Sequence, residues 1–325
     1  MKKLISTLLA AGAALFVLGG HQVHADDSWS KPVVTLGTSL TSDQRNGTIS
    51  TLTSSLNGGQ YDTLTVNGDT LVKYLNPSGS NFTSTSGVWS SAMVNKTDAG
   101  GINVHILDYN GVNNITTITA DQYRNAAVTA GVTNADIYIT SAIKIDGSGA
   151  LAGVYAAFAQ NGQTLNNNQI AAAQDEVNTL SGITQANKGK DGYTDKQLNN
   201  AVAGMKQAMA SQSNNGQQTL SQNQIGNIVD SQLKNNNLGT IINNNQRTQI
   251  VNLLVKIQNS GALSKSSFKD QAGKLANSIQ DSAKGIFSKI KTGVNSEEGR
   301  NFFQKIMDAI ASFFSGIVNW ISNLF

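Results

Sequence analysis

The chain contains 325 residues, with 23 Lys and Arg against 20 Asp and Glu, three His and no Cys. The absence of Cys excludes disulfides, thiolate nucleophiles and Cys-ligated metals, and a net charge of +3 gives no global attraction to nucleic acid. A chain of this length is large enough for about two domains.

The first 25 residues have the three parts of a secretory signal peptide. Lys2 and Lys3 form a basic start, residues 4–18 are apolar, and Val23-His24-Ala25 fits the spacing of a cleavage site. We therefore expect cleavage after Ala25 and a secreted, extracytoplasmic protein associated with the cell envelope. A retained membrane anchor is the alternative, although the apolar run is short for a bilayer span.

Removal of this segment leaves 21 Lys and Arg against 20 Asp and Glu, and a single histidine, His105. One His without Cys cannot build a His-rich zinc site, and we expect no cofactor. A Ser-His-Asp triad would have to use His105, but the sequence singles out no nucleophile beside it. The simpler interpretation is a histidine on the surface of a strand.

Residues 26–160 alternate between strand and helix patterns, which predicts an α/β domain. Two helices begin with the T-x-x-Q spacing of a capping box, at Thr41/Gln44 and at Thr119/Gln122, and Gly131 is the predicted end of the second. The predicted strands cover 32–37, 61–67, 87–96, 101–110 and 135–145, and the predicted helices 40–56, 69–75, 119–132 and 147–159.

Residues 161–262 are rich in Asn and Gln and contain repeated helix starts. The T-x-x-Q spacing recurs at Thr194/Gln197 and Thr219/Gln222, and "TLNNNQI" at 164–170 resembles "TLSQNQI" at 219–225. A disordered polar tract is the alternative, but regularly spaced apolar residues between 241 and 257 favour several short folded helices.

Residues 263–325 predict a helical hairpin. Apolar residues keep helical spacing from 268 to 290, and the second arm, 300–325, separates polar from apolar residues so cleanly that an amphipathic helix is expected. Its apolar face consists of Phe302, Phe303, Ile306, Ile310, Phe313, Phe314, Ile317, Trp320, Ile321 and Leu324.

This apolar face has two interpretations. It packs on the 268–290 helix and the preceding domain as ordinary core, or it lies in a membrane interface with its aromatic residues inserted. Seven Lys against two Asp between Lys256 and Lys291 favour the second interpretation, because Lys near an anionic lipid surface adds attraction.

Two further groups of residues have a chemical interpretation beside a structural one. "GSGALA" at 147–152 predicts a glycine turn with Ser148 as the helix N-cap; a weaker hypothesis is that N–H groups of Gly147, Ser148 and Gly149 bind an envelope phosphate. The carboxylates of Asp108, Asp121, Asp136 and Asp146 could form a glycosidase pair, although each position also suits a turn or a helix start.

Two long phrases carry a family resemblance: "VVTLGTSLTSDQR" at 33–45 and residues 100–158, which begin "GGINVHILDYNG". They resemble the YpuA-like family, an exported Gram-positive family of unknown function. The resemblance is clearest over residues 32–160 and weaker over the Asn/Gln-rich helices. It implies export and a shared fold, and because the family brings no established activity, no catalytic residue is carried over.

The sequence thus predicts an exported, non-enzymatic, envelope-associated binding or interaction protein of mixed α/β and helical architecture. The expected partners are a membrane surface or another envelope protein, and no nucleic acid. A carboxylate-dependent cell-wall hydrolase is the alternative function, and a purely structural envelope protein is a third hypothesis.

Overall fold

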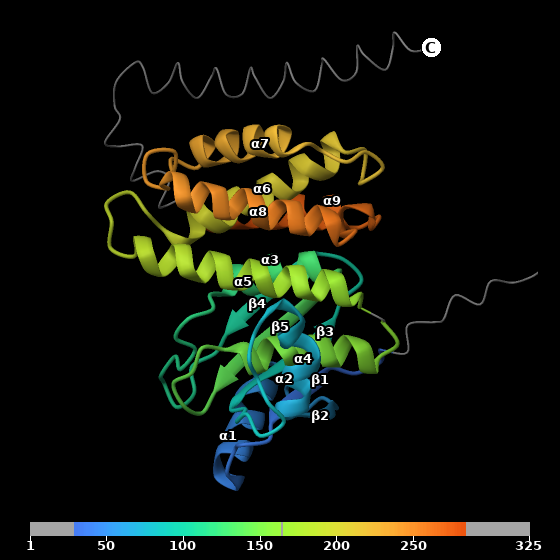
Figure 1. Cartoon of the computed structure of the whole chain (residues 1–325). Helices are drawn as coiled ribbons and strands as arrows, with labels where there is room; N and C mark the ends of the chain where they lie inside the picture. Colours follow the sequence, from blue (N-terminus) through green and yellow to red (C-terminus); the bar gives the residue numbers. More distant parts are fainter. Residues whose placement is uncertain (1–28, 164, 284–325) are drawn as a thin grey trace, which may run out of the picture.

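The computed structural model describes residues 29–163 and 165–283 (Figure 1). The predicted signal peptide, its cleavage site and the second arm of the C-terminal hairpin, including all ten residues of its apolar face, lie outside these ranges. Within them, a mixed sheet with flanking helices is followed by a helical part. Figure 1 shows α3 and α5 lying between the sheet and the remaining C-terminal helices, with α1 at the opposite end of the molecule.

The sheet has five strands in the order β2-β1-β3-β5-β4. β1 pairs with β2 in parallel and β4 with β5 in parallel, whereas the central β3 is antiparallel to both of its neighbours. Each parallel pair needs a crossover, which α1 provides between β1 and β2 and α3 between β4 and β5. The strand bounds are β1 Val33–Gly37, β2 Asp62–Val66, β3 Ser90–Lys96, β4 Ile102–Ile106 and β5 Ala135–Ser141.

The helices are α1 Ser42–Thr53, α2 Gly68–Leu75, α3 Ala120–Ala130, α4 Ser148–Gln160, α5 Asn167–Asn187, α6 Asp195–Gln212, α7 Gln222–Asn235, α8 Asn244–Asn259 and α9 Phe268–Ser282. No helix in the described part of the chain is both long and apolar enough to span a bilayer. The α/β region followed by a helical part confirms the predicted fold class. α9 coincides with residues 268–282 of the predicted first hairpin arm, and the hairpin itself stays a prediction.

Helix starts follow the predicted capping chemistry at most positions. Reciprocal capping boxes join Thr41 to Gln44 and Thr119 to Gln122, and Gly131 ends α3 with a left-handed φ of 87°. The backbone N–H of Gln197 donates to Thr194, as the T-x-x-Q spacing predicted.

The predicted start at Thr219/Gln222 is wrong by two residues. α7 is capped by Ser221, whose reciprocal partner is Gln224. In this register Leu220 and Ile225, 4% and 0% exposed, occupy the two positions of a hydrophobic staple across the helix start. Burial of this pair therefore selects Ser221 over Thr219 as the cap.

One apolar core runs through both the sheet region and the helical part. A single cluster of buried side chains extends in sequence from Val33 on β1 to Ile279 on α9. A second, small cluster of Val34, Leu36, Leu52 and Met93 lies between the other face of the sheet and α1. The helix at the centre of this arrangement is α3, in which ten of eleven residues are buried.

Candidate functional site

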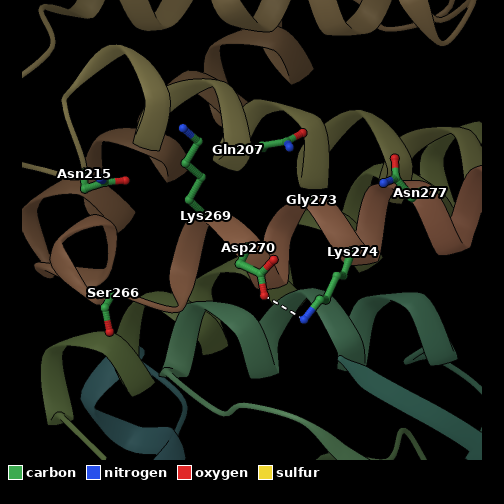
Figure 2. Close-up of a pocket in the computed structure, with 8 residues that line it drawn as sticks. All are labelled: Gln207, Asn215, Ser266, Lys269, Asp270, Gly273, Lys274 and Asn277. Atoms are coloured by element: carbon green, nitrogen blue, oxygen red, sulfur yellow. Dashed lines mark ion pairs between the residues drawn. The ribbon is translucent and has the colours of Figure 1, made fainter. Parts of the chain in front are cut away.

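A polar groove lies between α6 and α9 (Figure 2). It has a volume of about 440 Å³, which is within the range of about 300–1,000 Å³ that small-molecule sites occupy. We call it the α6–α9 groove, and its lining residues are Gln207, Asn215, Ser266, Lys269, Asp270, Gly273, Lys274 and Asn277.

The groove is held by close packing of the two helices that form it. Phe268, Ala272 and Leu275 are at most 3% exposed and place one face of α9 in the core, against α6 and α3. Gly273 sits where α6 approaches, because a Cβ at this position would lie 2.6 Å from Gln207 Nε2. The outward side of α9 therefore presents its polar residues beside the polar side of α6.

The polar side chains that line the groove are exposed, and several of them lack a protein partner. Among the described residues, the side chains of Gln207, Asn215, Ser266, Lys269 and Asn277 take part in no hydrogen bond or ion pair. Asp270, by contrast, pairs with Lys274 at 2.8 Å, as the dashed line in Figure 2 shows. One carboxylate against two ammonium groups leaves the groove with a net charge of +1, carried by Lys269.

The turn after α6 fixes one end of the groove. Asn215 adopts a left-handed φ of 54°, and its N–H donates to the carbonyl of Ala210 at 2.7 Å. The N–H of Gly216 donates to Ser213 Oγ at 2.9 Å. These bonds hold the turn in place, and Figure 2 shows Asn215 at one end of the row of labelled residues, with Asn277 at the other.

Sequence reasoning missed two polar clusters, one partly and one fully buried, that join the sheet region to the helical part. In the first, Asp195 at the start of α6 accepts hydrogen bonds from Thr119 Oγ1 at 2.6 Å and Thr184 Oγ1 at 2.9 Å. Burial raises the pKa of Asp195 above 3.8, hydrogen bonds from Thr119 and Thr184 oppose this shift, and the charge of Asp121 adds to it. The capping residue of α3 thus also binds α6.

The second cluster centres on an ion pair between Lys206 of α6 and Glu176 of α5. Their N–O distance is 2.9 Å, and both side chains are 0% exposed. Lys206 Nζ also donates to the carbonyl oxygen of Asn125 at 2.9 Å, and Thr129 Oγ1 donates to Glu176. The pKa of Lys206 is lowered, because burial outweighs the attraction of Glu176.

The predicted glycine turn at 147–149 is present, but its capping residue is not the predicted one. Gly147, with a φ of 107°, is the N-cap of α4, and Ser148 is the first helical residue. The Asp146 carboxylate accepts from Ser148 N at 3.0 Å and from Ser148 Oγ at 2.6 Å. Gly149 is buried against β3, where a Cβ would lie 2.8 Å from Ser90 Oγ. A protein carboxylate thus occupies the helix start for which the sequence suggested a phosphate.

The remaining candidate residues make their contacts with other residues and not with one another. His105 is exposed and stacks on Tyr138 of the neighbouring strand, with ring centroids 5.0 Å apart. Asp136 accepts from Asn103 at the beginning of β4, whereas Asp108 follows the end of that strand. Asp121 pairs with Arg124 at 3.1 Å. No group of three or more His, Cys, Asp or Glu in the described ranges is arranged to hold a metal ion.

Comparison with known proteins identifies the family. The chain is 30% identical over 159 residues to "Uncharacterized protein YpuA" of Bacillus subtilis (strain 168), an alignment that covers 49% of this chain and 51% of that protein. No solved structure matches the chain. The family model described as "Protein of unknown function (DUF1002)" matches residues 36–275, which include the end of β1, all of β2 to β5 and the first half of α9. The chain therefore belongs to the DUF1002 family of proteins of unknown function.

Proposed function

We propose that this protein is an exported, non-catalytic binding protein of the cell envelope, whose C-terminal segment 300–325 contacts a membrane surface. The observation that carries the proposal is that the described body buries its own apolar surface. An amphipathic helix at 300–325, as the sequence predicts, would therefore find no apolar counterpart on the described body.

The helix α9 shows this most directly. Its apolar residues Phe268, Ala272, Leu275 and Ile279 are between 0% and 3% exposed, since they already pack inside the body. The sides of α9 that remain exposed carry residues such as Lys269, Lys274 and Asn277. Packing of the 300–325 apolar face on α9 would thus place Phe and Trp side chains against ammonium and amide groups.

Outside α9, the described body also exposes few large apolar side chains on which the 300–325 segment could pack. Over residues 29–163 and 165–283, the exposed large apolar side chains are Val72, 36% exposed, and Val112, 49% exposed. An apolar face of ten residues would expose several hundred Å² if left uncovered, which is the size of patch that marks an interaction site. A lipid interface satisfies such a face by inserting its aromatic and aliphatic residues below the headgroups.

The basic segment before the tail adds less attraction than its sequence predicts. Lys256 pairs with Asp175 and Lys274 with Asp270, both at 2.8 Å. Lys265 and Lys269 have no carboxylate partner in the described part of the chain. Each Lys close to an anionic surface adds about 1 kcal/mol, so apolar insertion is the larger contribution.

The described residues do not favour the wall-hydrolase alternative. The α6–α9 groove contains a single carboxylate, Asp270, and it is ion-paired. Glycoside hydrolysis by a carboxylate pair needs two carboxyl groups about 5–10 Å apart across the scissile bond, an arrangement that the groove lacks.

Liposome flotation tests the proposal with three proteins: residues 26–325, residues 26–283, and a variant of residues 26–325 that carries Phe314→Ser, Ile317→Ser and Trp320→Ser. The truncation is placed after Ala283, because removal of α9 would uncover α6 and α3. With phosphatidylglycerol/phosphatidylcholine vesicles, only 26–325 should float.

A matched control changes the polar face of the same segment, with Ser312→Asn, Ser315→Asn and Asn319→Ser, and should float like the parent protein. Recovery of residues 26–325 entirely in the unbound fraction would refute membrane contact and leave a protein partner as the occupant. Equal flotation of residues 26–283 would place the lipid contact in the body instead.

A further inference from the structure

We propose that the α6–α9 groove binds a phosphodiester group that carries hydroxyl-bearing substituents. The inference adds a ligand site to the body and does not depend on whether the C-terminal segment contacts lipid. It is based on the charge of the groove, on its unpartnered polar groups and on its fixed walls.

The charge of the groove matches one phosphodiester. Lys269 contributes a positive charge that no carboxylate among the described residues neutralises, while Lys274 and Asp270 cancel each other. A phosphodiester carries a single negative charge. An ammonium group binds phosphate as a point charge, and the groove contains no Arg that would add bidentate recognition of a phosphate or a carboxylate.

The neutral groups of the groove suit hydroxyl substituents on either side of the phosphate. The amides of Gln207, Asn215 and Asn277 each supply two donors and an acceptor, and the Ser266 hydroxyl supplies both functions. No aromatic side chain lines the groove, so it lacks the flat apolar surface on which an uncharged sugar ring would stack. A volume of about 440 Å³ accommodates one phosphate with its two flanking polyol or sugar units.

The walls are fixed before a ligand arrives. Core packing holds α9, and the hydrogen-bonded turn holds Asn215. Gly216 packs so closely on the segment after α8 that a Cβ would lie 2.5 Å from Ser264 Oγ. Binding therefore orders a few exposed side chains and no backbone, which keeps its entropic cost small.

The same chemistry has two sources in an envelope: a lipid headgroup such as phosphatidylglycerol, and a water-soluble polyol-phosphate unit. The soluble probe is glycerophosphoglycerol, titrated into ¹⁵N-labelled residues 26–325 and followed by amide NMR. Saturable shifts are expected at Lys269, Gly273, Asn277 and Asn215. Glycerol and gluconate at equal ionic strength are the neutral and carboxylate comparisons, and both should bind more weakly.

Three variants test the charge assignment. Lys269→Gln should weaken glycerophosphoglycerol binding about three- to fivefold, and Asp270→Asn, which frees Lys274, should strengthen it by a similar factor. Lys188→Gln removes an exposed charge outside the groove and should leave the affinity unchanged. The proposal is overturned if gluconate binds equally well, if the shifts fall outside the groove, or if Lys269→Gln and Lys188→Gln behave alike.

Vesicle binding of the same variants separates the two sources. If Lys269→Gln weakens both the NMR titration and flotation on phosphatidylglycerol vesicles, a lipid headgroup is the ligand; if it weakens the titration alone, the ligand is the soluble unit. Flotation of the unmutated protein tests the C-terminal segment separately, so failure of that contact and failure of the groove site give different results.

Discussion

Lys206 and Glu176 form an ion pair in the interior of the protein, 2.9 Å apart and without solvent exposure. The pair joins α6 to α5, and through the Asn125 carbonyl and the Thr129 hydroxyl it also binds α3, the crossover helix of the sheet. Every charged atom of the pair has a hydrogen-bond partner, which offsets part of the cost of burying two charges. The pair therefore acts as a specific connection between the sheet region and the helical part.

Loss of one partner should be far more damaging than loss of both. Lys206→Met leaves Glu176 buried and uncompensated, and we expect the free energy of unfolding to fall by about 3–5 kcal/mol. The double variant Lys206→Met/Glu176→Leu should recover most of this loss, since both charges are removed together. Urea unfolding measures the three values.

Lys274→Gln is the control, because it breaks an exposed pair and should cost less than about 1 kcal/mol. If Lys206→Met were as mild as this control, the buried charge would be solvated in a way that the structure does not show.

The raised pKa of Asp195 predicts how the stability of the protein changes with pH. Its pKa is raised above the ordinary 3.8 by burial in the folded protein, so between these two values the folded state binds more protons than the unfolded state. Its contribution to stability is therefore present at low pH and is lost as the pH rises through the raised pKa. In Asp195→Asn this loss should be absent.

The measurement is urea unfolding of wild type and Asp195→Asn from pH 3.5 to 7. As the pH rises, the free energy of unfolding of Asp195→Asn should increase relative to that of the wild type. The control Asp191→Asn, which changes an exposed residue in the same loop, should follow the wild type. Parallel curves for wild type and Asp195→Asn would show that Asp195 does not titrate differently in the two states.

The register of α7 can be tested with two neighbouring hydroxyl residues. Ser221 caps the helix through Gln224 N, whereas Thr219 lies two residues earlier and caps nothing. Ser221→Ala should therefore cost about 1 kcal/mol, and Thr219→Ala less than about 0.5 kcal/mol, as measured by thermal unfolding. A larger loss for Thr219→Ala than for Ser221→Ala would instead support a helix that begins at Thr219, as the sequence motif alone predicts.

Local signals in the sequence predicted most of the secondary structure. Capping pairs such as Thr119/Gln122 act over three residues, so the sequence alone contains all the information they need. The error at α7 arose because "TLSQNQ" contains two overlapping capping motifs, and only burial of Leu220 and Ile225 in the tertiary structure chooses between them.

Long-range relationships could not be predicted in the same way. The order β2-β1-β3-β5-β4 depends on pairings between strands far apart in sequence, and the α6–α9 groove joins residues from 207 to 277. The sequence does contain one signal of the buried ion pair: Lys206 lies four residues after Val202 on the apolar face of α6, where a charge requires a buried partner. The identity of that partner still required the fold.

The buried residues Tyr123 and Tyr155 differ in their hydrogen bonding, so they should differ in how stability responds to loss of the hydroxyl group. Tyr123 Oη donates to the carbonyl of Gly147 at 2.8 Å, whereas Tyr155 Oη is buried without a partner in the described part of the chain. Tyr123→Phe leaves the Gly147 carbonyl unsatisfied and should lower the free energy of unfolding by about 1–2 kcal/mol. Tyr155→Phe removes a hydroxyl whose desolvation is not offset, so it should be neutral or stabilising.

Urea unfolding of the two variants at one pH distinguishes these outcomes, and each serves as the steric control for the other, because both changes delete a single oxygen. A loss in Tyr155→Phe as large as that in Tyr123→Phe would mean that Tyr155 has a bonding partner, with an ordered water between Tyr155 and Glu176 as the first candidate. The charge of Glu176 acts on Tyr155, since it adds to the effect of burial in raising the pKa of that hydroxyl. The same experiment in a Glu176→Gln background would then reduce the loss.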